Sequence, residues 1–226
     1  EGHHVPAGDD NLVLRVARLF PDMAAAMTLT KELPVASGIG GGSADAAAVW
    51  RGLCHMAKRD ADAARLLALG ADIPVCVPSQ AARMQGIGEV VLPLDGVPEL
   101  HVVLANPRVA VSTPQIFSAL TRKDNAPMPD RLPAFADAAA LCDWLATQRN
   151  DLQSAAEALA PQITQVCAAL SALPDCLLAR MSGSGATCFG VFATAQAAVD
   201  AAQKLSAARP QWWVRAGRLG TMQAKA

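Results

Sequence analysis

The sequence predicts a fold of the α+β class, in which helices and strands follow one another without an internal repeat. Three features support this prediction. Residues 27–33 alternate between two faces, as a half-buried strand does. A glycine cluster and an alanine-rich helical segment follow at 38–57. Farther along, helical segments at 135–173 precede a strand, a Ser/Gly turn and a second strand at 177–192.

The remaining elements are indicated by periodicity and by residues that cap helices. A shift in composition near residue 98, from a glycine-rich half to a helix-rich half, predicts two domains, 1–98 and 99–226. The other expected helices are 12–23 after Asp9–Asn11, 61–69, 113–120 after Ser112, and 195–208, and the other expected strands flank 86–89 or cover 100–105 and about 212–214, with a surface loop at 121–134.

Composition excludes several classes of protein. The 226 residues are 52% hydrophobic and 17% charged, so the chain can bury a sizeable core. A net charge of -1 gives no general attraction to nucleic acid or to an anionic membrane. The six cysteines lack metal-site spacing and are expected to be reduced core thiols of a cytoplasmic protein. The chain begins without Met, and we interpret it as missing its natural start.

Residues 34–48, PVASGIGGGSADAAA, place a glycine loop directly before a helix. A helix N-terminus carries free N–H groups and partial positive charge, and glycines let a ligand approach the backbone, so this arrangement suits a phosphate. The Ser43 hydroxyl could cap the helix or touch a phosphate or its magnesium. The simpler alternative is a glycine-rich turn with Ser43 only as a cap. The stretch is neither a Walker A loop nor a GxGxxG dinucleotide motif.

This glycine loop resembles the second motif of the GHMP kinases, which has the form PxxxGLGSSAA. Further stretches that agree with one subgroup of that family are LGADIPVCV at 69–77, GIGE at 86–89 and RMSGSGATCFGVF at 180–192, with weaker support from STPQIF at 112–117 and NDL at 150–152. The subgroup phosphorylates the 2-hydroxyl of a cytidine diphosphate sugar alcohol with ATP in non-mevalonate isoprenoid synthesis. The order and spacing of these motifs match from about residue 9 to the end.

The resemblance implies a fold and a set of ligands. The expected fold has an N-terminal domain with a left-handed βαβ crossover, a C-terminal ferredoxin-like domain and an active site between them. ATP is implied as the phosphoryl donor, and magnesium follows from the chemistry of ATP. The residues expected to bind ATP are Pro34, Ser37, Gly38, Ile39, Gly40, Gly41, Gly42 and Ser43.

Asp72 matches the position of the family's catalytic aspartate, which orients or deprotonates the acceptor hydroxyl. It precedes Ile73 and Pro74, an apolar setting in which a buried carboxylate would need a reason. A helix cap or turn aspartate is the alternative. Asp45 is expected in the first turn of the glycine-loop helix, where it complements the helix dipole.

The acceptor is expected to contact residues from several motifs. The candidates are Ile87, Thr113, Pro114, Phe117, Ser182, Gly183, Ser184 and Gly185. Phe117 is expected to stack on the cytosine base, although it could instead be a core residue of its helix. The turn at 182–185 could equally be only a tight hairpin. No feature indicates an oligomeric state.

The sequence departs from the family in one respect. The motif that carries the family's catalytic lysine and an upstream Tyr-His pair do not occur, and the chain contains no Tyr. Lys31 does not match the lysine motif. We therefore expect weak or absent turnover from this chain alone. The alternatives are another GHMP kinase, acting on homoserine, mevalonate, phosphomevalonate or a sugar, and a non-catalytic nucleotide-binding fragment.

Overall fold

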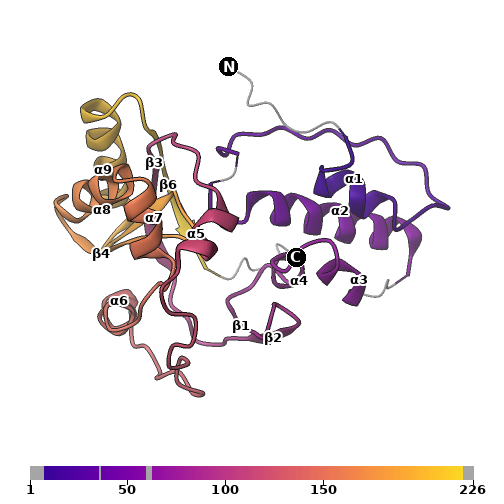
Figure 1. The fold of residues 1–226 in the computed structure, drawn as a ribbon, viewed down its shortest axis with the longest axis horizontal. Coiled ribbons are helices and arrows are strands. Elements are labelled where there is room, and N and C mark those ends of the chain that lie inside the picture. Colours follow the sequence, from indigo (N-terminus) through magenta and orange to yellow (C-terminus); the bar gives the residue numbers. More distant parts are fainter. Residues whose placement is uncertain (1–7, 36, 60–62, 221–226) are drawn as a thin grey trace. The chain divides into compact units, whose positions relative to one another are not determined.

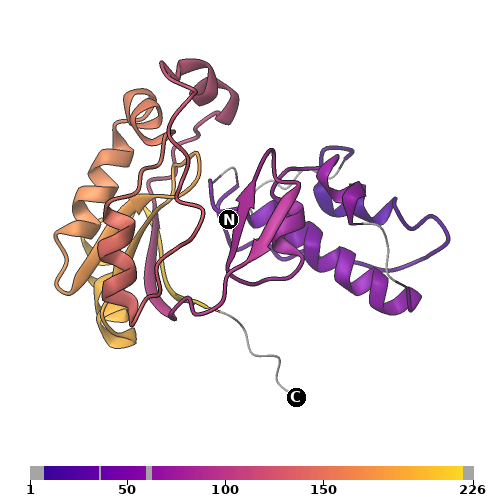
Figure 2. The same ribbon diagram turned by 90° about the horizontal axis from the view of Figure 1, so that it is seen from below.

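The computed structural model describes residues 8–35, 37–59 and 63–220. The chain forms two compact units (Figures 1 and 2). The described part of the first unit comprises residues 8–35, 40–59 and 63–95, and that of the second comprises residues 37–39 and 96–220. The predicted domain boundary at residue 98 stays a prediction.

The first unit is mainly helical. Its elements are α1 (Leu12–Ala17), α2 (Gly41–Ala57), α3 (Ala64–Leu67), α4 (Ile73–Cys76), β1 (Ala82–Gln85) and β2 (Val90–Pro93). The two strands flank residues 86–89, as predicted, and they pair as an antiparallel hairpin. The helix predicted at 12–23 ends earlier, at Ala17, and α4 was not predicted because four residues are too few to show a period.

The core of the first unit forms where α1 packs on α2 (Figure 1). Asn11 begins α1, because its side chain accepts a hydrogen bond from the Val13 N–H at 2.9 Å. The rings of Phe20 and Trp50 meet edge to face, with centroids 5.4 Å apart. Around them lie the other buried residues Val16, Ala46, Ala47, Leu53, Leu66 and Ile73.

The strand predicted at 27–33 does not form. A strand needs a neighbour to pair with its N–H and C=O groups, and no described segment pairs with these residues. Met27 and Leu29 remain 40% and 37% exposed. The alternation of the sequence correctly shows two faces, but it carries no information about a pairing partner. Within the described residues, the first unit has one antiparallel strand pair, so the left-handed crossover implied by the resemblance is not seen there.

The second unit is a four-stranded antiparallel sheet with helices. The strands are β3 (Leu100–Asn106), β4 (Cys176–Met181), β5 (Cys188–Phe192) and β6 (Trp213–Leu219), in the order β4-β5-β3-β6. The helices are α5 (Thr113–Ala119), α6 (Ala138–Ala146), α7 (Gln153–Leu159), α8 (Gln162–Ser171) and α9 (Ala195–Ala208). Strand order and element order together give the ferredoxin-like arrangement that was expected.

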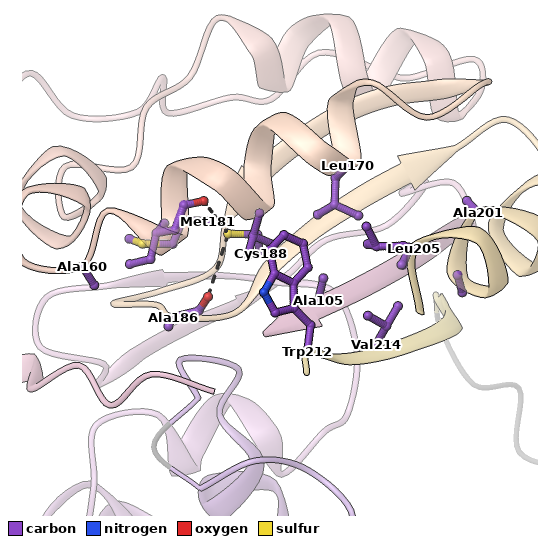
Figure 3. Close-up of a cluster of buried hydrophobic side chains, with 14 of the residues drawn as sticks. Ala105, Ala160, Leu170, Met181, Ala186, Cys188, Ala201, Leu205, Trp212 and Val214 are labelled. Carbon is purple, nitrogen blue, oxygen red and sulfur yellow. Dashed lines mark hydrogen bonds between the residues drawn. The ribbon is translucent and has the colours of Figure 1, made fainter. Parts of the chain in front are cut away.

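The sheet of the second unit is covered on both faces. On one face Val103 and Ala105 of β3 pack with residues of α8 and α9, in the cluster shown in Figure 3. On the other face Leu100 and Val102 pack with Leu141 and Cys142 of α6. A central strand buried on both faces has a nearly continuous apolar sequence, which is why LHVVLA predicted β3 correctly.

All six cysteines are free thiols. Cys142 and Cys188 are buried, and the other four are half-buried. Burial raises the pKa of the Cys142 thiol to about 11. Of the helices in the described residues, none has the length and apolar character needed to cross a membrane.

Candidate active site

The first residues of the glycine loop pack against the SGSGA turn within the second unit. The Ser182 hydroxyl donates a hydrogen bond to the Gly38 carbonyl at 2.9 Å. Gly38 has φ +71°, and a Cβ atom there would lie 2.7 Å from the Gly185 nitrogen and 2.8 Å from the Ser182 oxygen. A Cβ at Gly183 would lie 2.8 Å from the Gly38 oxygen. Both loops therefore need glycine, because their backbones are in direct contact.

Side chains from two other segments hold the SGSGA turn. The Asn150 amide nitrogen donates to the carbonyls of Gly183 at 2.8 Å and Met181 at 3.3 Å. The hydroxyls of Thr113 and Ser184 lie 2.8 Å apart. The backbone N–H groups of Gly183 and Ser184 have no hydrogen-bond partner among the residues described. The turn is thus fixed in shape while it keeps donors available for an anion.

A buried polar pair lies below this turn. The Asn106 amide nitrogen donates to the Thr187 hydroxyl at 2.9 Å, and its oxygen accepts from the Arg108 N–H at 2.7 Å. Asn106 and Thr187 are 3% and 0% exposed. The Thr187 N–H also donates to the Ser37 carbonyl at 3.2 Å, so this pair connects the sheet to the glycine loop. Buried polar groups with satisfied hydrogen bonds fix one geometry.

The remaining glycines form the N-terminus of α2 in the first unit. Gly40 is the N-cap, in the left-handed region with φ +68°, and no side chain caps the helix. The N–H groups of Gly41, Gly42 and Ser43 have no partner within residues 8–35, 37–59 and 63–220. Ser43 is therefore the third residue of the helix rather than its cap. Three free N–H groups at the start of a 17-residue helix can bind a phosphate.

A half-buried ion pair lies beside this helix start. Lys31 Nζ and Asp45 Oδ2 are 2.6 Å apart, and their side chains are 13% and 28% exposed. Asp45 is in the second turn of α2, not in the first as predicted, because the helix begins at Gly41 rather than at Ser43. Lys31 Nζ would also lie 3.3 Å from a Cβ at Gly41. A cation thus stands close to the free N–H groups.

The GADIP and GIGE motifs meet in the first unit. A Cβ at Gly88, where φ is +110°, would clash with the Ala71 carbonyl oxygen and lie 3.1 Å from its carbon. Asp72 follows Ala71 at the N-cap position of α4, but its side chain makes no capping hydrogen bond. Asp72 is exposed, although the residues that follow it are apolar. The apolar residue of this segment that is buried is its neighbour Ile73.

The two apolar candidates for binding the substrate are exposed. Ile87 is 74% exposed at the tip of the β1–β2 hairpin. Phe117 is 51% exposed on α5, whereas its neighbour Ile116 is fully buried. Ile116 therefore supplies the core contact of this helix, and the alternative that Phe117 is a core residue has no support. Pro114 occupies the first turn of α5, as predicted.

The structure brings many of the predicted site residues into contact, and it adds others. In the second unit the contacts join Ser37, Gly38, Thr113, Ser182, Gly183, Ser184 and Gly185. Asn106 and Thr187 were not predicted, and Asn150 was noted only within NDL. An Asn at the end of an apolar strand, as in LHVVLAN, is a pattern that would have indicated Asn106. Pro34 is buried, and Ile39 and Gly42 have no polar contact from a described side chain.

The acidic and thiol side chains do not assemble into a metal cage. Within the described residues there is no group of three or more His, Cys, Asp or Glu that could hold a metal ion. Mg²⁺ bound together with a nucleotide needs only one or two protein ligands, because phosphates and water supply the rest. The Ser43 hydroxyl beside the free N–H groups of α2 is compatible with such a role.

Comparison with known proteins identifies the family of this chain. Residues 11–84 match the family model "GHMP kinases N terminal domain", and residues 132–211 match "GHMP kinases C terminal". The chain belongs to the GHMP kinases.

Within that family, the chain resembles one enzyme in particular. It is 55% identical to 4-diphosphocytidyl-2-C-methyl-D-erythritol kinase of Roseobacter denitrificans, over 100% of this chain and 78% of the relative. It is 54% identical to the enzyme of the same name from Cereibacter sphaeroides (strain ATCC 17025), over 96% of this chain and 78% of the relative.

Solved structures agree with this resemblance. A crystal structure of 4-(cytidine 5'-diphospho)-2C-methyl-D-erythritol kinase superposes with a TM-score of 0.78 at 30% identity, covering 96% of this chain and 81% of that one. A homoserine kinase from Cytophaga hutchinsonii shares the fold, with a TM-score of 0.66 at 17% identity, covering 96% of this chain and 78% of that one.

Proposed function

We propose that this protein transfers the γ-phosphoryl group of ATP to the 2-hydroxyl of 4-diphosphocytidyl-2-C-methyl-D-erythritol, a step of non-mevalonate isoprenoid precursor synthesis. The observation that carries this proposal is the 55% identity, over the whole chain, to a relative of that name. The free thiols fit a reducing compartment, so the proposal includes a cytoplasmic location. The proposed partner is a small-molecule substrate, and neither a nucleic acid nor a membrane is proposed as a partner.

The glycine loop binds the phosphates of ATP. The free N–H groups of Gly41, Gly42 and Ser43 donate to phosphate oxygens, and the partial positive charge of the α2 N-terminus favours their negative charge. The Ser43 hydroxyl is the protein group that would hold magnesium, which supplies charge neutralisation when it is bound with ATP. The residues assigned to ATP are Pro34, Ser37, Gly38, Ile39, Gly40, Gly41, Gly42 and Ser43.

Asp72 acts as the general base for the acceptor hydroxyl. Its side chain makes no capping bond, so the carboxylate remains available to accept the hydroxyl proton. As the proton moves to Asp72, the hydroxyl oxygen attacks the γ-phosphorus and the bond to the ADP oxygen breaks. Positioning and charge stabilisation supply most of the catalysis in such transfers, so the geometry of the two glycine motifs matters as much as the base.

The acceptor binds through groups that are exposed and chemically suited to it. The exposed ring of Phe117 offers a face on which cytosine can stack, and Ile87 offers an apolar contact. The SGSGA turn, Ser182 to Gly185, presents the free N–H groups of Gly183 and Ser184 to the diphosphate. Thr113 and Pro114 hold α5 beside this turn, through the contact between the hydroxyls of Thr113 and Ser184.

The role of Asp72 is tested by Asp72→Asn, with Asp95→Asn as a matched change at an exposed site. ADP formation is measured with the chain joined to the part of the Roseobacter relative that lies outside the match. A general base contributes about 10²- to 10⁴-fold, so Asp72→Asn is expected to lower kcat by that factor with KM nearly unchanged. An unchanged kcat in Asp72→Asn would show that Asp72 is only a turn residue.

A further inference from the structure

Two cysteines of the second unit have sulfur atoms in contact, and the kinase chemistry uses neither. Cys167 lies on α8 and Cys188 is the first residue of β5, and their sulfurs are 3.2 Å apart. All six cysteines of the chain lie in the described residues, and this pair has the only hydrogen bond between two sulfurs there. The elements that carry them are packed against each other, since both contribute to one core cluster.

The two sulfurs are in non-bonded contact. A disulfide has a sulfur–sulfur distance of about 2.05 Å, so the two atoms need to approach by roughly 1.2 Å. Rotation of the two side chains and a shift of α8 on the sheet would together have to supply that approach.

The two thiols differ in access and in acidity. Cys167 is half-buried, whereas Cys188 is fully buried among the apolar side chains of the cluster (Figure 3). The hydrogen bond with Cys188 lowers the pKa of the Cys167 thiol, and the Arg180 guanidinium acts in the same direction. The same bond and burial raise the pKa of Cys188. Cys167 is therefore the thiol that ionises and meets a small oxidant first.

We propose that Cys167 and Cys188 are an oxidation site that forms a disulfide when the protein meets hydrogen peroxide. The Cys167 thiolate attacks one peroxide oxygen, which forms a sulfenic acid and releases hydroxide. The sulfur of Cys188 then attacks the sulfenic sulfur, the disulfide forms, and the hydroxyl group leaves as water with the Cys188 proton. Two thiols are oxidised and one peroxide is reduced to two molecules of water.

The position of Cys188 gives this oxidation a structural consequence. Its sulfur lies 3.9 Å from the Ala186 carbonyl oxygen, a contact drawn as a dashed line in Figure 3. Thr187, the next residue toward the SGSGA turn, donates its N–H to Ser37. Because cores are closely packed, drawing the sulfurs together shifts the start of β5 or the facing turn of α8. The disulfide therefore forms close to the SGSGA turn, where a shift of the chain can alter the shape of that turn.

The test uses the purified chain and counts its thiols. The chain is treated with hydrogen peroxide, quenched, unfolded, alkylated and weighed by mass spectrometry. The expected result is the loss of two alkylatable cysteines, from six to four, and a disulfide between tryptic peptides 150–180 and 181–204. A dithiol reductant is expected to restore all six. Six alkylatable cysteines after peroxide, or irreversible oxidation of Cys167 without a disulfide, would overturn the proposal.

Variants identify the sulfurs involved. Peptide 150–180 contains both Cys167 and Cys176, so Cys176→Ser is the matched control and is expected to keep the disulfide. Cys167→Ser is expected to abolish it. In Cys188→Ala the sulfenic acid on Cys167 has no partner, and a dimedone adduct is expected on that residue. A disulfide that persists in Cys167→Ser, or that is lost in Cys176→Ser, would contradict the assignment. None of these results depends on kinase turnover.

Discussion

Gly38 and Gly183 lie where two backbone segments, far apart in sequence, touch each other. The contact leaves no room for a Cβ at either residue, and both have positive φ. In the sequence these glycines belong to two separate motifs, each of which could have been only a turn. Their contact shows that the motifs form one structure, with Ser182 bonded to the Gly38 carbonyl.

Gly38→Ala separates the steric requirement from the conformational one. Gly96 provides the matched control, because it also has φ +71° but a Cβ added there would meet no atom within 4 Å. Gly96→Ala is expected to lose only the cost of a left-handed residue, about 1 kcal/mol. Gly38→Ala adds the overlap with Gly185 and should lose distinctly more. Urea unfolding measures both, and equal losses would show that the two loops are not in contact.

The raised pKa of the Cys142 thiol leads to a prediction about the stability of the folded chain at alkaline pH. Its pKa is raised to about 11 in the folded chain, from an ordinary value near 9, because burial disfavours the thiolate. The folded state therefore holds the proton more tightly, and the stabilisation is present below pH 9 and lost as the pH rises towards 11. Two pKa units correspond to about 3 kcal/mol.

Thermal unfolding between pH 8 and pH 11 measures this effect. The chain has no Tyr, so fewer other groups titrate in this range. Cys142→Ala is expected to show a smaller fall in Tm with pH, although its Tm at pH 8 is lower because a buried side chain is shortened. Cys54→Ala serves as the control at a half-buried site. A pH dependence unchanged by Cys142→Ala would contradict the raised pKa.

At the scale of helices and strands, the sequence correctly predicted the elements that a local pattern determines. The helix α2 follows from alanine content and the stripe of Ala46, Trp50 and Leu53, and β3 follows from an apolar run. The strand predicted at 27–33 failed because strand formation depends on a partner elsewhere in the chain. Asp45 lies in the second turn of α2 rather than in the first, because the helix begins at Gly41, two residues earlier than predicted.

The sequence predicted only those residues of the candidate site that belong to a local motif. Glycines and motif residues stand out in a sequence. Within the second unit, Gly38 of the glycine loop and Thr113 both contact the SGSGA turn. Asn106, Asn150 and Thr187 support that site through hydrogen bonds between distant segments. Such partners cannot be predicted from spacing along the chain, because these bonds span 31, 33 and 81 residues.

Asn150 leads to a prediction about the turn. Asn150→Asp replaces a nitrogen that donates to the Gly183 and Met181 carbonyls with an ionised oxygen that repels them. The expected loss of unfolding free energy is about 1–3 kcal/mol at pH 7, and it should shrink at pH 4, where the acid can donate one bond. Gln165→Glu, at an exposed site on α8, is the control. Equal Tm changes in the two variants would remove Asn150 from this role.

At the scale of the whole molecule, composition and the order of motifs predicted the class of fold. The ferredoxin-like order of the second unit agrees with that prediction, and the match to a solved kinase at 30% identity covers 96% of the chain. Composition gives no information about the identity of the acceptor. A homoserine kinase at 17% identity shares the fold, so the fold alone does not identify the acceptor.

The proposed function depends above all on the identity of the acceptor, which ADP formation can establish. ATP, magnesium and one acceptor at a time are supplied from a panel of 4-diphosphocytidyl-2-C-methyl-D-erythritol, mevalonate, homoserine and galactose. The chain is assayed alone and joined to the part of the Roseobacter relative that lies outside the match, with that relative as the positive control. We predict ADP formation with the cytidine acceptor and with no other acceptor of the panel. ADP formation with another acceptor, or none from either form while the relative is active, would contradict the proposed function.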